Sequence, residues 1–369
     1  MNDRIAAEVF APGEFLAEEL EARGWSQTEL GEILGRPPRV VNEIIAGKRA
    51  ITPETAKGLA AAFGTSAQFW MNLETSYQLS KAKIEDQEVT RRAALYGLFP
   101  VKELVKRGWV EASENLDVLE QRFLDFFGMK TMADQPKFAH AARKTAYEGT
   151  SITQLAWLHR AKQVAKAVQI GKFSVQLLRE AIIELRKCLE YVEEIRNVTA
   201  ILSRAGVRVV VVEHLGSIKM DGACFWIGES PVIALSLRFD RIDNFWYNLF
   251  HEIDHILHGE GKDEPIFEII DPFTPMLPPT EKRANAEAAN YCVPSGELEN
   301  FIARVHPIFS KQAVLGFASR LNIHPGLVVG QLQGRKLIPF SYHREFLVKV
   351  REAVTSAVLT DGFGNKLSL

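Results

Sequence analysis

The segment of residues 245–259, FWYNLFHEIDHILHG, most strongly constrains how this chain can fold. Its apolar periodicity predicts one helix, which carries the pattern His-Glu-x-x-His at His251, Glu252 and His255. Residues four apart share a helical face, so both imidazoles can reach one ion. A catalytic zinc bound in this way needs a third protein ligand and an open position for water. Because the pattern also arises by chance, the surrounding sequence has to supply the context.

The third ligand is expected after this helix. Prolines scattered through residues 260–279 exclude one regular helix there. Thr280 then caps a predicted helix, EKRANAEAANYCVP, with Glu281 in its first turn and Glu287 about two turns later. Its small residues allow it to pack closely against the histidine helix. One carboxylate from this helix, either Glu281 or Glu287, would complete a His2Glu site.

Before the histidine helix the sequence changes to strand periodicity. Residues 207–212 form a β-branched run that predicts a buried strand. Asp221-Gly222 predicts a turn between short strands at 217–220 and 223–227, and residues 231–237 predict a further strand. We expect a sheet edge just before the histidine helix, where an extended peptide can add as another strand.

Residues 1–80 contain short helical patterns separated by glycine and proline. Ser26 and Glu29 form a capping-box pattern that opens one helix, and Pro38 opens the next. Two short helices joined by a tight turn predict a helix-turn-helix domain, whose second helix would enter the major groove of DNA.

Basic residues gather around the predicted recognition helix. The net charge of -2 gives no global nucleic-acid signal, so a DNA-binding surface has to be local. Residues 36–49 carry four basic groups against one acid, Glu43, whereas the first helix is acidic. A five-helix protein-interaction module with charged loops is the alternative. The residues expected to contact bases or phosphates are Gln27, Arg36, Arg39, Asn42, Lys48 and Arg49.

The same region resembles the HigA-type antitoxins of the XRE helix-turn-helix family. The segments WSQTELGEILG, VNEIIAGKRAITPETA and FGTSAQFWMNLE carry this resemblance. It implies a regulator that binds a double-stranded DNA operator, usually as a homodimer. Many such antitoxins neutralise a small ribonuclease, so a HigB-like toxin is a candidate partner.

Residues 206–333 resemble the ImmA/IrrE family of zinc-dependent peptidases. The segments DGACFWIG, PVIALSLRFDR, FWYNLFHEIDHILHG and EKRANAEAANYCVP carry this resemblance. It implies a zinc-dependent metalloendopeptidase that cleaves a repressor or other regulatory protein and is latent until a signal arrives. Many members have a second acid two residues after the third ligand, where this chain has Arg283.

The resemblance also implies the roles of individual residues. One Zn2+ per chain would be held by His251, His255 and Glu281, and Glu252 would act as general base toward the attacking water. The second group that stabilises the oxyanion stays open among three candidates, which are His258, His324 and Tyr247. A structural zinc, or a site without metal, is the alternative.

The expected fold class is multi-domain. An all-α helix-turn-helix domain at residues 1–80 and a helical connector at 81–203 precede an α+β zincin-like domain at 204–369. Three scattered cysteines and the lack of a membrane-length apolar run lead us to expect a cytoplasmic protein.

Two functions remain open at this point. The first is a DNA-binding transcriptional regulator whose zinc endopeptidase cleaves a regulatory protein in a stress, mobile-element or toxin-antitoxin setting. The second is a HigA-like antitoxin and autorepressor whose zinc domain is a non-catalytic sensor or scaffold. The intact Glu252 favours the first, because a structural zinc site needs no general base.

Overall fold

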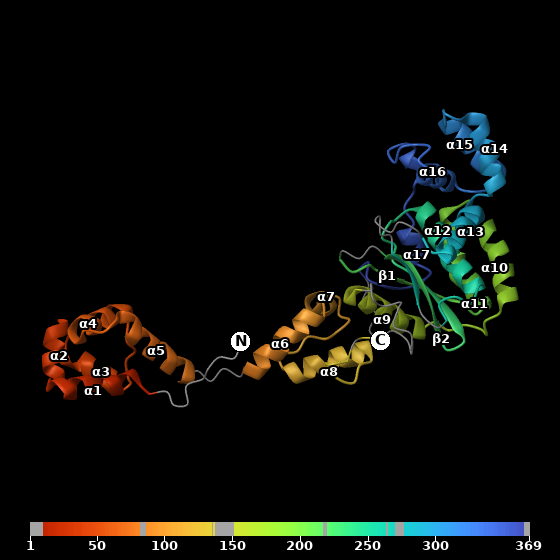
Figure 1. Ribbon diagram of the computed structural model, residues 1–369. Helices are drawn as coiled ribbons and strands as arrows, with labels where there is room; N and C mark the ends of the chain where they lie inside the picture. The colour runs from red at the N-terminus through yellow and green to blue at the C-terminus, as the bar shows by residue number, and fades with distance from the viewer. Residues whose placement is uncertain are drawn as a thin grey trace. The chain divides into compact units, whose positions relative to one another are not determined.

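The computed structural model describes residues 10–81, 86–134, 136, 151–216, 220–262, 265–269 and 277–364. The chain forms two compact units, Met1–Thr90 and Arg91–Leu369 (Figure 1). The first unit has its own hydrophobic core, and the second has two cores on opposite faces of a sheet. Among the helices described here, none is both long enough and apolar enough to cross a membrane.

The N-terminal unit confirms the predicted helix-turn-helix arrangement. Ser26 and Glu29 form the capping box, with each residue's side chain accepting from the other's backbone N–H at 3.2 and 2.7 Å. Gly35, at φ 63°, ends the first helix of the motif. The helices of this unit are α1 (Pro12–Arg23), α2 (Gln27–Leu34), α3 (Pro38–Ile45), α4 (Pro53–Phe63) and α5 (Ala67–Lys81).

The core of this unit fixes how α3 is presented. Val41 and Ile44 are buried on its inner face, while Val40 is only partly buried. A Cβ at Gly13 would lie 2.5 Å from the carbonyl oxygens of Ile44 and Ile45, so only glycine lets α1 pack against the end of α3. This packing leaves the opposite face of α3 in solvent.

The C-terminal unit is built on a mixed five-stranded sheet with the strand order β4-β2-β3-β1-β5. Strand β1 runs parallel to β3 and β5, and β2 runs antiparallel to β3 and β4. The strands are β1 (Arg208–Val212), β2 (Met220–Ile227), β3 (Ser230–Leu235), β4 (Ile266–Ile269) and β5 (Leu359–Asp361).

Helices cover both faces of this sheet. Val210 and Val212 of β1 face one core, which is shared with α7 (Val101–Lys106), α8 (Leu116–Phe127) and α9 (Ile152–Lys166). Val209 and Val211 face the other core, with α10 (Val175–Lys187), α11 (Val198–Arg204) and α12 (Ile242–Leu257). Of the helices at residues 101–204, expected to form a connector, α9 and α11 therefore pack onto the sheet itself.

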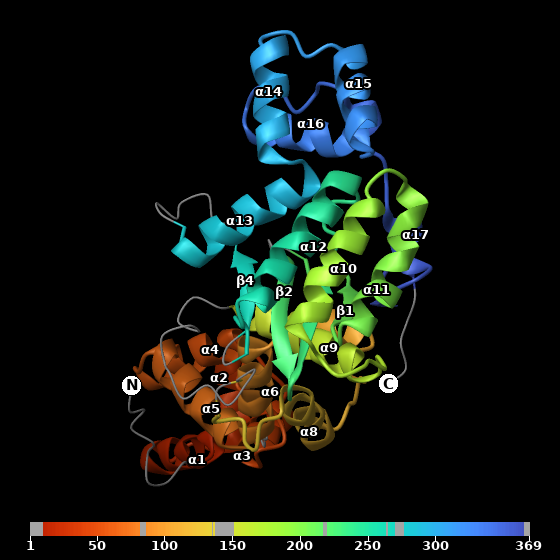
Figure 2. The same ribbon diagram turned by 90° about the vertical axis from the view of Figure 1, so that its right-hand side faces the viewer.

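Helix α12, which carries the His-Glu-x-x-His pattern, lies beside α13 (Pro279–Cys292) in Figure 2. Ala284 and Ala288 of α13 are fully buried, and these small side chains allow the close approach that the sequence predicted. The other helices of the chain are α6 (Asp86–Leu98), α14 (Ser295–Val305), α15 (Lys311–Leu321), α16 (Pro325–Gly334) and α17 (Arg351–Thr355).

Two sequence-based predictions about the sheet are wrong. Asp221-Gly222 is not a turn, because both residues lie inside β2, where Gly222 pairs with Leu235 and buried Asp221 is held by Arg238 at 2.7 and 3.0 Å. The strand that precedes α12 is not an edge either, because β3 lies between β2 and β1. The predicted strand at 217–220 falls mostly outside the described residues.

Candidate metal centre and nucleic-acid interface

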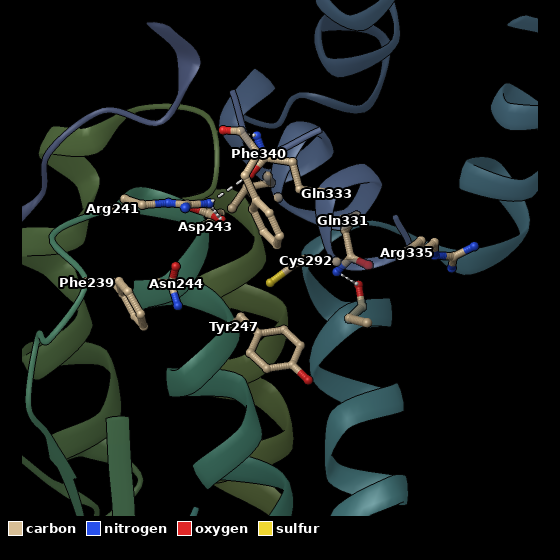
Figure 3. A pocket seen from close by; sticks show the side chains of 14 residues that line it. Phe239, Arg241, Asp243, Asn244, Tyr247, Cys292, Gln331, Gln333, Arg335 and Phe340 are labelled. Atoms are coloured by element: carbon tan, nitrogen blue, oxygen red, sulfur yellow. Dashed lines mark hydrogen bonds and ion pairs between the residues drawn. The ribbon is translucent and has the colours of Figure 1, made fainter. Parts of the chain in front are cut away.

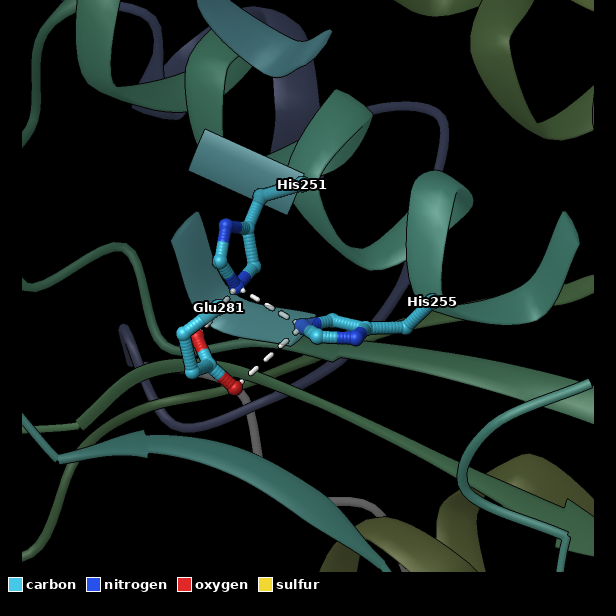
Figure 4. Close-up of side chains that lie close together, drawn as sticks. All are labelled: His251, His255 and Glu281. Carbon is cyan, nitrogen blue, oxygen red and sulfur yellow. Dashed lines mark hydrogen bonds and ion pairs between the residues drawn. The ribbon is translucent and has the colours of Figure 1, made fainter. Parts of the chain in front are cut away.

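Three predicted ligands converge between α12 and α13. The Nε2 atoms of His251 and His255 lie 3.0 Å apart, and the Glu281 carboxylate oxygens lie 3.3 Å from the first and 3.4 Å from the second. Figure 4 shows both rings and the carboxylate turned toward one point. Within the described residues this is the group arranged to hold a metal ion, and it contains Glu281 but not the alternative ligand Glu287.

The spacing of these atoms fits zinc. Zinc bonds of about 2.0–2.1 Å in a tetrahedral arrangement place ligand atoms roughly 3.3 Å apart. The 3.0 Å between the two Nε2 atoms, the 3.3 Å from His251 to Glu281 Oε2 and the 3.4 Å from His255 to Glu281 Oε1 are each close to that edge length. Two imidazole nitrogens and one carboxylate are also a usual donor set for a zinc with one open position.

The three side chains perturb one another's protonation in the metal-free state. Burial acts to lower the pKa of His255, but the carboxylates of Glu281, Glu252 and Glu260 outweigh it and raise that pKa to about 9. Burial acts to raise the pKa of Glu281, but hydrogen bonds from His251 and His255 lower it to about 2. A cation at this point would take the place of the His255 proton.

Glu252 is positioned by a glycine in the neighbouring sheet. Its side chain is 1% exposed, and a Cβ at Gly222 of β2 would lie 2.5 Å from its Oε1 atom. The carboxylate therefore lies against the backbone of the strand, in a space that any amino acid other than glycine at position 222 would fill. The sequence interpretation missed this role, because an Asp-Gly pair is typical of turns.

A second layer of polar residues surrounds the ligands. Glu260 Oε2 lies 2.7 Å from His255 Nδ1, and the guanidinium of Arg283 donates to both Glu260 oxygens at 3.1 and 2.7 Å. Arg283 also donates from Nε to buried Asp254 at 2.8 Å. Glu260 was not singled out from the sequence. The sequence feature that could have indicated this role is an acidic residue shortly after the second histidine, His255.

The three candidates for oxyanion stabilisation lie in different places. Tyr247 stacks on His251 with ring centroids 6.4 Å apart and donates its hydroxyl to Asn285 at 2.5 Å. His258 is bound to the carbonyl of Asp254 at 2.8 Å, and His324 accepts from Gly326 N–H at the start of α16. Of these three side chains, that of Tyr247 is the one that stacks on the ring of a ligand histidine.

A pocket of about 600 Å³ opens one helical turn from His251. Figure 3 shows Phe239, Asn244 and Tyr247 on one side and Gln331 and Phe340 on the other. Tyr247 contributes both to this pocket and to the environment of the ligands.

The outward face of α3 carries the predicted DNA contacts. Asn42 is exposed and donates to Gln27 at 3.1 Å, which joins the first residue of α2 to the middle of α3. Glu43 accepts from Arg39 at 2.8 Å and from Arg49 at 2.7 Å. The Arg49 and Arg39 hydrogen bonds lower the pKa of Glu43, so it stays an anion beside these cations.

The remaining basic residues flank this helix. Lys48 and Arg49 follow its end and are exposed, while Arg36 precedes it and is half-buried. The six predicted contact residues therefore come from α2, α3 and the two segments that flank α3. This arrangement suits contacts to bases from the helix and to phosphates from its ends.

Known proteins match the N-terminal part of the chain. A family profile described as Helix-turn-helix matches residues 16–70. Virulence-associated protein I of Dichelobacter nodosus is 40% identical over 79 residues, which cover 21% of this chain and 73% of the relative. The uncharacterized HTH-type transcriptional regulator YddM of Escherichia coli is 32% identical over 72 residues, covering 20% of this chain and 77% of the relative.

A solved structure also resembles this part. The structure of Pseudomonas aeruginosa antitoxin HigA with the higBA promoter is 37% identical and covers 20% of this chain and 82% of that one, with a TM-score of 0.20. These similarities extend over about a fifth of the chain. The assignment of the metal centre is therefore based on the geometry of its side chains.

Proposed function

Since the chain belongs to the helix-turn-helix family of DNA-binding regulators through its N-terminal unit, we propose that it binds an operator and carries a zinc-dependent endopeptidase in its second unit. The observation that carries the enzymatic half is the convergence of His251, His255 and Glu281, with contacts of 3.0 to 3.4 Å between their ligand atoms, beside buried Glu252. The sequence resemblance to the ImmA/IrrE peptidases supports the same reading.

The DNA-binding half rests on the exposed face of α3. Asn42 has a side-chain amide, the group that reads adenine in the major groove. Arg39, Lys48 and Arg49 provide exposed cations on and after the same helix, where they meet phosphates. The operator is double-stranded DNA, and a homodimer on a two-fold site is the assembly we propose.

In the proposed peptidase, each residue of the metal centre has a chemical role. His251, His255 and Glu281 hold the ion between two helices. When bound, zinc acidifies water and polarises a carbonyl oxygen. Glu252 accepts the proton of the attacking water and delivers it to the nitrogen of the leaving amine. Its placement against Gly222 keeps the carboxylate beside the ligands without metal coordination of its own.

The substrate we propose is a regulatory protein, such as a repressor. An enzyme attached to an operator-binding unit meets other DNA-bound regulators at high effective concentration. A homodimeric regulator of this kind would stay latent until a stress or mobile-element signal arrives.

The alternative is a HigA-like antitoxin and autorepressor with a HigB-like toxin as partner. The 37% identity to antitoxin HigA favours it for the N-terminal unit. In that case the zinc domain is a sensor or scaffold, and Glu252 has no chemical task. A small toxin gene beside this gene, together with unchanged proteolysis on removal of Glu252, would select this alternative.

The first experiment is to measure the zinc bound per chain. We expect the purified protein to bind about one zinc per chain, and His251→Ala to bind none, because two remaining ligands cannot complete the site. Matched His306→Ala, which removes an exposed histidine outside the centre, keeps full zinc content. Equal zinc content in His251→Ala and wild type would refute the metal centre.

A further inference from the structure

We propose that Glu260 is a positioning residue for the ligand His255, and that Arg283 holds Glu260 in place. The proposal rests on the metal centre of the proposed function. The pair would set how tightly the metal is held without touching it.

The first link joins Glu260 to His255. Glu260 Oε2 lies 2.7 Å from Nδ1, while Nε2 of the same ring faces His251 and Glu281. A carboxylate that accepts from Nδ1–H fixes the tautomer in which Nε2 carries the lone pair needed for a metal. It also fixes the orientation of the ring.

The backbone brings this carboxylate back to its partner. Helix α12 ends at Leu257, and Gly259 adopts φ 70°, which turns the chain back. The N–H of Glu260 then donates to the carbonyl of His255 at 3.0 Å. Glu260 is thus tied to His255 through both its backbone and its side chain.

The second link joins Arg283 to two acids. Its Nη atoms donate to both Glu260 oxygens at 3.1 and 2.7 Å, and its Nε donates to Asp254 at 2.8 Å. A planar guanidinium matches such paired acceptors, and its fork leaves the carboxylate little freedom to rotate. Asp254 is 1% exposed, so it depends on this partner.

These links connect the two helices that supply the ligands. Asp254 precedes His255 on α12, and Arg283 follows Glu281 by two residues on α13. A clamp of Asp254, Arg283 and Glu260 therefore fixes the separation of the ligand-bearing segments. An acid at position 283 would instead add a third carboxylate beside Asp254 and Glu260, and these charges would repel.

The experiment compares metal affinity in matched variants. Zinc affinity is measured by competition with a chromophoric chelator in the full chain, and the ligand field is followed by the absorption spectrum of bound Co2+. The variants are Glu260→Gln, Arg283→Gln, their double variant, Arg283→Lys, and the control Arg320→Gln. The control removes an exposed guanidinium that binds Glu297 at 2.6 Å, away from the centre.

Glu260→Gln is expected to weaken zinc binding about 10–100-fold and to shift the Co2+ bands, as for loss of an outer-shell partner. Arg283→Gln weakens binding in the same direction, and the loss in the double variant is smaller than the sum of the two single losses, because part of the effect of Arg283 passes through Glu260. Arg283→Lys retains part of the affinity, since it keeps the charge without the fork. Arg320→Gln matches wild type.

Two outcomes separate this inference from the proposed function. Wild type that binds neither zinc nor Co2+ overturns both. Wild type that binds metal while Glu260→Gln keeps the same affinity and spectrum overturns only the positioning role of Glu260. Strictly additive losses in the double variant overturn the statement that Arg283 holds Glu260 in place.

Discussion

At the scale of single residues, the position of Glu252, the proposed general base, depends on the absence of a side chain at Gly222 of β2. Glu252 occupies the space that a side chain at Gly222 would fill, with its Cδ and Cγ atoms only 3.2 and 3.3 Å from the position of a Cβ. Because Glu252 is buried, it has little room to move aside. Strand and helix therefore fit together only when position 222 is glycine.

We expect Gly222→Ala to lower the free energy of unfolding of the C-terminal unit by about 1–3 kcal/mol, the usual cost of overpacking. The matched control is Gly316→Ala in α15, where no atom lies within 4 Å of the added Cβ. There alanine should stabilise by about 0.5–1 kcal/mol, because glycine is unfavourable within a helix. Denaturant unfolding of the metal-free chain measures both, and equal effects of the two changes would contradict the account.

A pH dependence follows from the ligand pKa values. His255 titrates at about 9 in the metal-free folded chain against 6.5 as its ordinary value, so its stabilising contribution is complete below pH 6.5 and is lost as the pH rises toward 9. Glu281 titrates at about 2 against 4.5, so its contribution is present above pH 4.5 and is lost as the pH falls toward 2.

Metal-free protein should therefore lose stability between pH 6.5 and 9. Glu281→Gln should reduce this loss, because it removes a carboxylate that raises the His255 pKa. Unfolding midpoints measured at pH 6, 7.5 and 9 test the prediction. An identical pH profile in wild type and Glu281→Gln would refute the coupling of the two side chains.

At the scale of elements, α3 combines two kinds of DNA contact. Asn42 lies mid-helix beside Gln27, whereas Lys48 follows the end of the helix. Side chains within a recognition helix read base edges, and cations at its ends bind phosphates. The two residues should therefore affect binding in different ways.

Asn42→Ala is expected to cost about 1–3 kcal/mol of discrimination between the selected operator and a mismatched duplex. Lys48→Ala should weaken binding to all sequences and reduce the slope of log K against log salt by about 0.9. Fluorescence anisotropy with a duplex selected by wild type from a random pool measures both, with Arg320→Ala as control. Unchanged affinity in both DNA-face variants would refute the placement of α3.

The same elements show what the sequence could predict. The capping box of Ser26 and Glu29 and the opening of α3 at Pro38 were predictable, because these signals act within one turn of chain. The spacing of His251 and His255 was sufficient to predict that both side chains lie on one face of the helix. Gly222 was misread because only Glu252, distant in sequence, explains a glycine inside that strand. Strand order and the clamp at Glu260 likewise depend on tertiary contacts.

At the scale of the whole molecule, the chain contains two compact units with separate cores. The predicted DNA contacts all lie in the first, and the candidate metal centre lies wholly in the second. We therefore expect operator binding and metal chemistry to be separable activities in one chain. The central proposal for this molecule is that the second unit cuts a protein.

The measurement that tests this claim most directly is a comparison of protein N-termini in cells that express wild type or Glu252→Gln. The substitution removes the proposed base while leaving the three ligands, so zinc content should be unchanged. We predict new N-termini in a regulatory protein with wild type and their absence with Glu252→Gln. The same N-termini at the same abundance in both would contradict it.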